Sequence, residues 1–425
     1  MKTTALIVFA AMYILMILFM KKRLWIILAA AAFMVVSGIL PLSAIPGAIN
    51  WNVLMMITGT MVLVEYFIRS QMPNLLSDIL LEKSRNVMWV IIYMSLFSGA
   101  ISAFIDNVAT VLMVAPVGLA ICKKLKISPV PMILSIAVSS NLQGAATLVG
   151  DTTSIMLGAY ANMDFMDFFW MKGHPGIFFA VELGALATVP VMMFLFRRDT
   201  QPVDAHQRTK VLTLVPSVLL CIMVLALIAV SFFPDKPANT NGVLCILFAL
   251  AGVIHDLAAA KKEGTAGHTR EALKSIDFET LFILLGLFLV IAAVTQVGLI
   301  DDIAQLIGNA GGSNIFLLYT IIVWGSVAAS AFIDNIPYVA TMLPVLAGLC
   351  TYLQIEPYLL YFGLLTGATL GGNLTPIGAS ANITATGLLK KNGYDTTFSD
   401  FMKIGVPFTL TAVLAGYLFI WIFWH

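Results

Sequence analysis

Long apolar segments recur along the whole chain and are separated by short polar stretches. Most are about 17 to 25 residues long, enough for a helix to cross a hydrocarbon layer of about 30 Å. The pattern predicts spans near residues 4–20, 24–40, 51–68, 130–158, 176–196, 211–233, 242–258, 279–298, 357–389 and 404–424. Two further stretches, 87–121 and 314–350, are about 35 residues long, which barely suffices for two full crossings. A re-entrant hairpin that ends inside the membrane fits each of them at least as well.

Composition agrees with an all-α polytopic membrane protein. Of 425 residues, 60% are hydrophobic and 11% are charged, against about 25% charged in soluble domains. The net charge of +1 supplies no basic face for nucleic acid, so no nucleic-acid partner is expected. The chain has no nucleotide-binding loop, nucleophile elbow or zinc helix motif, which argues against an enzyme or an ATP-driven pump. The four cysteines show no paired spacing and are interpreted as packing residues.

Positive charge is concentrated in a few short loops, and such loops mark the cytoplasmic side of an inner (plasma) membrane. These loops are Lys21–Arg23, Lys83–Arg85, Lys123–Lys126, Arg197–Lys210, Lys261–Lys274 and Lys390–Lys391. Stretch 87–121 has basic residues on both sides, so it enters and leaves from the cytoplasm. Stretch 314–350 has no Lys or Arg near either end, so it enters and leaves from outside. The two hairpins are therefore predicted to point toward each other.

The chain repeats itself internally. Residues 102–107 read SAFIDN and residues 330–335 read SAFIDN again, an offset of 330 − 102 = 228. The same offset places Pro116 on Pro344, Gly144 on Gly372, Thr147 on Thr375, Gly150 on Gly378 and Ser154 on Asn382. Each half holds five spans and one hairpin, an odd number of crossings, so the second half is expected to be inverted. Residues 1–205 and 206–425 are thus predicted to be two inverted repeats, the plan of secondary transporters.

The hairpin centres carry the first candidate site residues, Asp106 and Asp334. An ionised Asp at the bilayer centre costs about 3 kcal/mol, so it persists where it faces a cavity, a cation or a proton path. A wetted surface turn is the alternative. Neighbouring oxygens can coordinate a cation or satisfy freed backbone groups. These residues are Ser102, Asn107, Ser330 and Asn335, and a candidate Na⁺ site comprises Asp106, Asn107, Asp334 and Asn335.

Two long spans contain a helix-breaking motif, NLQGAATLVGDTTS at 141–154 and TLGGNLTPIGASAN at 369–382. Broken spans occur where their backbone is buried in protein or lines a cavity. The N-termini of half-helices can hold an anion, and unwound carbonyls with Thr or Asn oxygens suit Na⁺. Helix packing through small residues is the alternative. The candidate residues are Asn141, Gly144, Thr147, Gly150, Asp151, Thr152, Ser154, Gly372, Asn373, Thr375, Gly378, Ser380 and Asn382.

The halves differ in charge, because the 228-residue offset aligns Asp151 of the first half with Ala379 of the second. A carboxylate without a repeat partner is a good candidate for binding or exchanging a proton. Glu65, Glu182 and Asp256 also lie in or at apolar spans. They fit a proton path and interhelical hydrogen bonds equally well.

At these motifs the sequence resembles the ion transporter superfamily, most closely its arsenite permease and melanosomal P-protein branch. The resemblance covers nearly the whole chain from about residue 50, through SAFIDNVATVLMVAPV at 102–117, SAFIDNIPYVATMLPV at 330–345, GAATLVGD at 144–151, GGNLTPIGASAN at 371–382 and NGYDTTFSDFMKIGVP at 392–407. The Asp-Asn pair at the tip of each predicted hairpin is also similar in position to the Ser-Asn-Thr motif of sodium-coupled dicarboxylate symporters. The resemblance implies a homodimer with a scaffold and an elevator-like transport domain. Relatives commonly have Gly-Asp-Pro-Pro-Asn where this chain has Gly-Asp-Thr-Thr-Ser at 150–154, a departure at the substrate site.

The sequence therefore favours a secondary transporter that moves a small anion or oxyanion-type solute by alternating access. H⁺ or Na⁺ is the expected coupling ion, and no other cofactor is expected. A Na⁺/H⁺ antiporter is nearly as well supported, because carboxylates sit at both hairpin tips. A channel or an intramembrane enzyme lacks a supporting motif.

Overall fold

The computed structural model describes residues 1–203, 208–233, 235–263, 267–311 and 314–425. Helices form nearly all of its regular structure, and the all-α prediction is confirmed. Within the described residues, the strands are β1 (Trp170–Met171) and β2 (His174–Pro175), which pair antiparallel. Seven helical segments of this part of the chain are long and apolar enough to cross a membrane. The predicted repeat boundary between 205 and 206 lies outside the described residues.

The helices of the first half follow the predicted spans closely. They are α1 (Lys2–Leu18), α2 (Arg23–Val36), α3 (Ile45–Ala48), α4 (Trp51–Arg69), α5 (Met72–Lys83), α6 (Val87–Ser102), α7 (Asn107–Leu125), α8 (Val130–Gln143), α9 (Thr152–Tyr160) and α10 (Ile177–Leu195). Stretch 87–121 thus forms α6 and α7, and span 130–158 forms α8 and α9 with an interruption between them.

The second half is also built from helices. Its helices are α11 (Val215–Val230), α12 (Thr240–Glu263), α13 (Thr269–Lys274), α14 (Phe278–Gln296), α15 (Leu299–Gly311), α16 (Ile315–Ser330), α17 (Asn335–Leu353), α18 (Tyr358–Leu365), α19 (Ser380–Lys391) and α20 (Phe398–Trp424). Between α18 and α19 the backbone forms a π-helical turn at Thr366–Leu370 and a 3₁₀ turn at Gly372–Leu374.

Local structure recurs at the sequence offset of 228 residues. The limbs α6 and α7 begin and end at the positions that correspond to α16 and α17. Lys126 and Gln354, which are also 228 apart, both end their helices with a φ of 55° in the left-handed region. The two halves therefore repeat backbone conformation as well as sequence. The opposite membrane orientation of the halves stays a prediction.

The short elements were not predicted from the apolar pattern. Helices α5 and α15 have 12 and 13 residues, too few to cross a bilayer, and they carry polar residues among their apolar ones. Each precedes a hairpin, and α5 contacts α6 while α15 packs against α17. A search for crossing-length segments cannot find such connecting helices.

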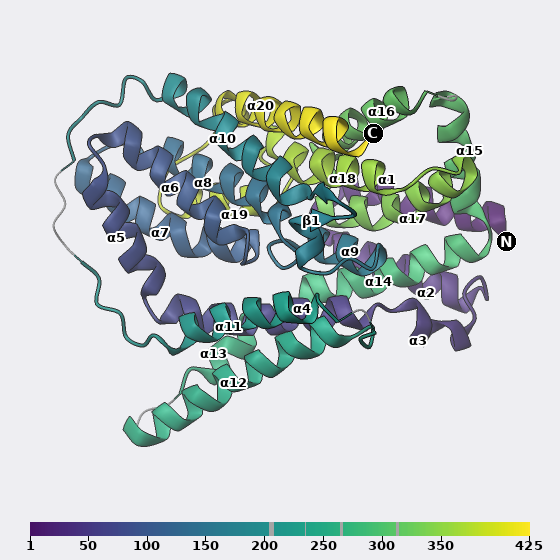
Figure 1. Ribbon diagram of the computed structural model, residues 1–425, viewed down its shortest axis with the longest axis horizontal. Helices are drawn as coiled ribbons and strands as arrows, with labels where there is room; N and C mark the ends of the chain where they lie inside the picture. The colour runs from purple at the N-terminus through teal and green to yellow at the C-terminus, as the bar shows by residue number, and fades with distance from the viewer. Residues whose placement is uncertain (204–207, 234, 264–266, 312–313) are drawn as a thin grey trace.

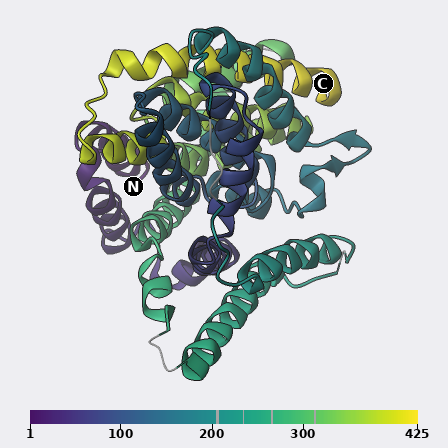
Figure 2. The ribbon, with the colours of Figure 1, turned by 90° about the vertical axis from the view of Figure 1, so that its left-hand side faces the viewer.

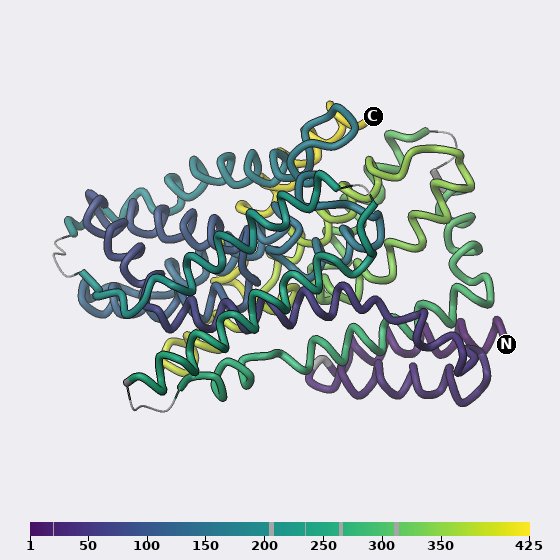
Figure 3. Tube along the Cα trace, turned by 60° about the horizontal axis from the view of Figure 1, so that its bottom comes forward, coloured from purple at the N-terminus to yellow at the C-terminus, as the bar shows by residue number. Residues whose placement is uncertain are grey.

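The helices form two layers. Helices α2, α4, α12 and α14 lie along the lower side of Figure 1, with α4 packed against α12 and α2 against α14. Above them lie the hairpins and the interrupted helices. Figure 2 shows α12 standing away from that upper group, and Figure 3 shows α1 and α2 running beside α14. Hairpin α6–α7 occupies the left half of Figure 1 and hairpin α16–α17 the right half.

The interrupted helices lie at the centre of the upper layer. Every residue of α8 from Met132 to Gln143 is buried, and so is every residue of α18 from Leu359 to Leu365. The hairpin limbs α6 and α16 and the long helices α10 and α20 surround them. The backbone groups that lack a helical partner at the two interruptions are therefore enclosed by protein, as a broken helix in a membrane requires.

Candidate functional site

Each hairpin tip uses its aspartate as the N-cap of the second limb. The backbone N–H groups of Val108 and Ala109 donate to Oδ1 of Asp106, at 3.0 and 3.1 Å. In the other hairpin the N–H of Ile336 donates to Oδ1 of Asp334, at 3.1 Å. One oxygen of each carboxylate thus stabilises helix α7 or α17, because an N-cap satisfies otherwise unpaired N–H groups. The second oxygen, Oδ2, remains for other contacts.

Each tip is docked onto an interrupted helix by a threonine and a glycine. The hydroxyl of Thr147 donates to the carbonyl of Ala103, and the hydroxyl of Thr375 donates to the carbonyl of Ala331. The repeat-equivalent glycines complete the contact, Gly150 in the first half and Gly378 in the second. A Cβ at Gly150 would lie 2.6 Å from three carbonyl oxygens, and one at Gly378 2.5 and 2.6 Å from two. No larger residue fits these contacts, so the Thr-x-x-Gly spacing fixes each tip to its helix.

A chain of side-chain amides joins the two interrupted helices. Asn107 donates to Oδ1 of Asn141 at 2.9 Å, and Asn141 donates to the carbonyl of Thr369 at 2.7 Å and to Oδ1 of Asn373 at 3.1 Å. Asn373 in turn donates to the carbonyl of Val138 at 2.8 Å. These amides link α8 to α7 and to the turns between α18 and α19. Their role in the structure is to hold the two halves together.

A cavity of about 190 Å³ lies where the two tips and the second parts of the interrupted helices meet. It is lined by Arg23, Met61, Asp106, Asn107, Val108, Asp151, Thr152, Asp277, Thr280, Asn335, Ile336, Ser380, Ile383 and Thr384. Val108 and Ile336 are repeat-equivalent, so both hairpins contribute the same position to it. Both sequence repeats therefore converge on one small polar space.

The cavity wall carries three carboxylates, from Asp106, Asp151 and Asp277. Asp151 is 3% exposed; its Oδ2 accepts a hydrogen bond from Thr153 at 2.7 Å and one from Asn335 at 3.5 Å. Asp151 therefore connects α9 of the first half to hairpin α16–α17 of the second. Asp277 caps α14, with both carboxylate oxygens bonded to Thr280.

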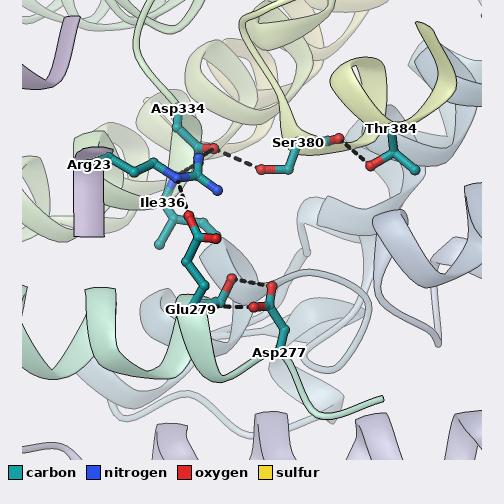
Figure 4. Close-up of polar contacts among 8 residues, drawn as sticks. Arg23, Asp277, Glu279, Asp334, Ile336, Ser380 and Thr384 are labelled. Atoms are coloured by element: carbon teal, nitrogen blue, oxygen red, sulfur yellow. Dashed lines mark hydrogen bonds and ion pairs between the residues drawn. The ribbon is translucent and has the colours of Figure 1, made fainter. Parts of the chain in front are cut away.

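Within the part of the chain that the structure describes, one cationic side chain lines the cavity with these carboxylates, and it belongs to α2. Figure 4 shows the Arg23 guanidinium between two acidic groups, with Nη1 2.6 Å from Oδ2 of Asp334 and Nε 3.2 Å from Oε1 of Glu279. Oδ2 of Asp334 also accepts a hydrogen bond from Ser380 at 2.8 Å. No hydrogen bond or ion pair reaches Oδ2 of Asp106 from the described residues. The second tip is thus neutralised within the protein, and the first is not.

The N-termini of α9 and α19 are open toward this region. Their N-cap residues, Asp151 and Ala379, make no side-chain capping hydrogen bond. At the repeat-equivalent position in the first turn, Oγ of Ser154 and Oδ1 of Asn382 are buried without a hydrogen-bond partner among the described residues. Unpaired N–H groups at a helix N-terminus attract negative charge. These two half-helices are therefore suited to an anion.

The predicted site residues divide into two groups. Asp106, Asn107, Asp151, Thr152, Asn335 and Ser380 line the cavity, and Asp334 lies directly behind Arg23 and Ser380. The others lie behind the wall, and all but Ser154, whose hydroxyl has no partner among the described residues, hold the tips and interruptions in place. They are Ser102, Asn141, Gly144, Thr147, Gly150, Ser154, Ser330, Gly372, Asn373, Thr375, Gly378 and Asn382.

Sequence reasoning missed Arg23, Asp277, Thr280 and Thr384. Arg23 had been used only as a marker of the cytoplasmic side, because it follows two lysines. Asp277 and Thr280 carry a recognisable helix N-cap signal before an apolar run. That signal locates the start of α14 but gives no indication that the start faces the tips.

The helical fold, the buried interrupted helices and the polar cavity fit the class of integral membrane transporters. A family model described as "Citrate transporter" matches residues 12–367, and the chain belongs to this family. An uncharacterised transporter of Mycobacterium tuberculosis is 30% identical over 438 residues, which cover 99% of this chain and 98% of that protein.

Two other similarities agree with this family. The P protein of Mus musculus is 28% identical over 466 residues; these cover 92% of this chain but only 56% of the longer P protein. The crystal structure of the Alcanivorax borkumensis YdaH transporter superposes with a TM-score of 0.61 at 12% identity, covering 89% of this chain and 87% of that one. The second similarity concerns the fold alone. The first is in line with the resemblance to the P-protein branch of the ion transporter superfamily.

Proposed function

We propose that this protein is a secondary active transporter of a small carboxylate or oxyanion solute, driven by H⁺ or Na⁺. The observation that carries the proposal is the charge of the cavity. Three carboxylates line it, and its one cation within the described residues is already engaged by Asp334 and Glu279. An anion entering this space meets net negative charge. It can bind only after protons or metal cations have neutralised carboxylates, which makes its binding depend on the coupling ion.

The class of solute follows from size and from the open helix ends. The cavity volume of about 190 Å³ suits a small solute. The uncapped N-termini of α9 and α19 supply N–H donors for carboxylate or oxyanion oxygens. The family description adds citrate to the solutes to be tried first.

Transport is proposed to occur by alternating access between two inverted repeats, with an elevator-like movement of the upper layer against the lower. The two layers of Figure 1 supply a group that holds the cavity residues of both hairpins and a separate group built on α4 and α12.

Exposed apolar residues recur along α12 at Val243, Leu247, Leu250, Ile254 and Leu257. Their spacing places them on one face, suited to lipid or to a second copy in a homodimer. The expected location is the inner membrane.

A Na⁺/H⁺ antiporter is the second candidate, and the unpaired Oδ2 of Asp106 favours it. In that mechanism Asp106 and Asp151 bind the transported cations themselves, at the candidate Na⁺ site with Asn107. The half-helix N-termini then have a structural role only.

Flux into proteoliposomes separates the two candidates. Purified protein is reconstituted, a Na⁺ or pH gradient is imposed, and uptake of citrate, dicarboxylates, arsenite and inorganic anions is measured. Gradient-dependent uptake of one anion, saturable and absent from empty liposomes, is the expected result. Dye-reported H⁺ movement driven by Na⁺ without any anion would instead establish the antiporter. No flux of either kind would contradict both.

A further inference from the structure

We propose that Arg23 is a built-in counter-cation. In this conformation its guanidinium takes the place at Asp334 that an ion from solution takes at Asp106, so the second half-site needs no coupling ion while Asp334 is paired with Arg23. The inference rests on the proposed function in one respect, namely that ion binding is coupled to transport. The charge pairing itself is independent of what the protein transports.

The contacts of the second tip are complete. Oδ1 of Asp334 accepts from the N–H of Ile336, while Oδ2 accepts from Arg23 at 2.6 Å and from Ser380 at 2.8 Å. The carboxylate is 9% exposed, so its partners and not water satisfy it. Glu279 of α14 holds the same guanidinium from the opposite side, as Figure 4 shows. Arginine keeps its proton at any physiological pH, so this cation is permanent.

The first tip has the same backbone and none of these partners. Both donors to Asp106 are backbone N–H groups that bind Oδ1, and Oδ2 has no partner among the described residues. Thr152 stands at the position that corresponds to Ser380, but its hydroxyl makes no hydrogen bond to Asp106. Asp106 is half-buried, and its unpaired oxygen, near the Asp151 carboxylate, can take up a proton or a cation. Asp106, with Asp151 and Asn107 beside it, therefore offers a free cation site that its repeat partner lacks.

The pairing predicts a specific change in ion requirement when the guanidinium is removed. In Arg23→Gln, Asp334 loses its cation and lies in a space already lined by Asp106, Asp151 and Asp277. It then needs an ion from solution, like Asp106. In the double variant Arg23→Gln/Asp334→Asn both charges are absent, and the need disappears. Arg23→Lys keeps a positive charge within reach of the carboxylate.

The test measures the ion dependence of substrate uptake and of unfolding for these variants. Arg208→Gln is the matched control, because Arg208 pairs with Glu82 at 2.8 Å at the protein surface. For Arg23→Gln we expect a steeper ion dependence of uptake, with a Hill coefficient higher by about one, since each ion site adds to the attainable value. The double variant and Arg23→Lys are expected to return to the wild-type coefficient. Arg208→Gln is expected to match the wild type throughout.

Thermal unfolding in detergent gives the second measurement, and it does not require transport. We expect the Tm of Arg23→Gln to lie below that of the wild type and to rise with added Na⁺ or with falling pH, because ion uptake by the native state stabilises it. The double variant should lack this additional response. Wild-type ion dependence of Arg23→Gln in both measurements would overturn the inference, as would a double variant as impaired as Arg23→Gln. Absence of gradient-driven uptake in the wild type would contradict the proposed function instead, and unfolding would still decide the role of Arg23.

Discussion

The two hairpin tips of this protein share one backbone design and differ in charge. In both, an aspartate caps the second limb, a threonine hydroxyl holds a tip carbonyl, and a glycine permits the close approach of three carbonyl oxygens. Among the described residues, only the second tip has a cation, supplied by α2, and Asp151 of the first half stands at the position where the second half has Ala379. The comparison teaches that repetition specifies the scaffold of a transport site, while its electrostatics are set by residues outside the repeated motif.

Neutralising the tip aspartates should have the largest effect. Asn is as good an N-cap as Asp, so Asp106→Asn and Asp334→Asn keep helices α7 and α17 and remove only charge. We expect both to abolish gradient-driven uptake in proteoliposomes, Asp106→Asn through loss of the ion site and Asp334→Asn through an unbalanced Arg23. Size-exclusion profiles close to wild type serve as the folding control. Unchanged transport in both variants would remove the role assigned to the tips.

Asp151→Asn should weaken ion binding without eliminating it. Its carboxylate accepts from Thr153 and Asn335 and adds negative charge to the first half-site. Loss of one charged hydrogen bond, about 1.5–3 kcal/mol, corresponds to a half-saturating ion concentration roughly 10- to 100-fold higher. Uptake measured over a Na⁺ or pH series tests this. Asp302→Asn, at an exposed pair with Lys2, is the control, and an equal shift in both variants would contradict a specific role.

Adding a methyl group at the docking glycines should destabilise both halves alike. A Cβ at Gly150 or Gly378 meets carbonyl oxygens at 2.5–2.6 Å, so each alanine variant is expected to lose about 1–3 kcal/mol of stability. Gly387→Ala in α19 meets nothing within 4 Å and should be neutral or stabilising. Thermal unfolding in detergent compares the three. A large effect at only one of the two docking glycines would show that the tips are not built alike.

The smallest expected effect is that of the docking hydroxyls. Thr147→Val and Thr375→Val keep the shape of the side chain and remove its hydrogen bond to the tip carbonyl. Each should lower stability by about 1 kcal/mol. The Tm of the two variants should fall by similar amounts, and a rise in either one would count against the docking contact.

Much of this architecture was readable from the sequence because membrane helices and helix breakers leave strong signals. Apolar length located the long helices, and the repeated SAFIDN motif located both tips to the residue. Asp106 and Asn335 came from this motif, Asp151 and Ser380 came from the helix-breaking motifs, and the structure places all four at the cavity.

The remaining residues depend on tertiary contacts that no local pattern encodes. Arg23 is separated from Asp334 by 311 residues, and its neighbours Lys21 and Lys22 gave it the appearance of an ordinary loop charge. Conversely, Gly144, Thr147, Gly150 and their partners looked like ligand groups, yet they support the tips from behind the cavity wall. Polar and small residues serve both roles, and only their orientation in the fold separates them.

The central claim is that both tips meet at one cavity, which holds the solute. Val108 and Ile336 are repeat-equivalent and both line it. Each can be changed to cysteine after the four native cysteines, Cys122, Cys221, Cys245 and Cys350, are replaced. Labelling with a membrane-impermeant thiol reagent is then measured with and without the transported solute. The account predicts that one solute protects Val108→Cys and Ile336→Cys at the same half-saturating concentration; free labelling of either position whatever the solute would contradict it.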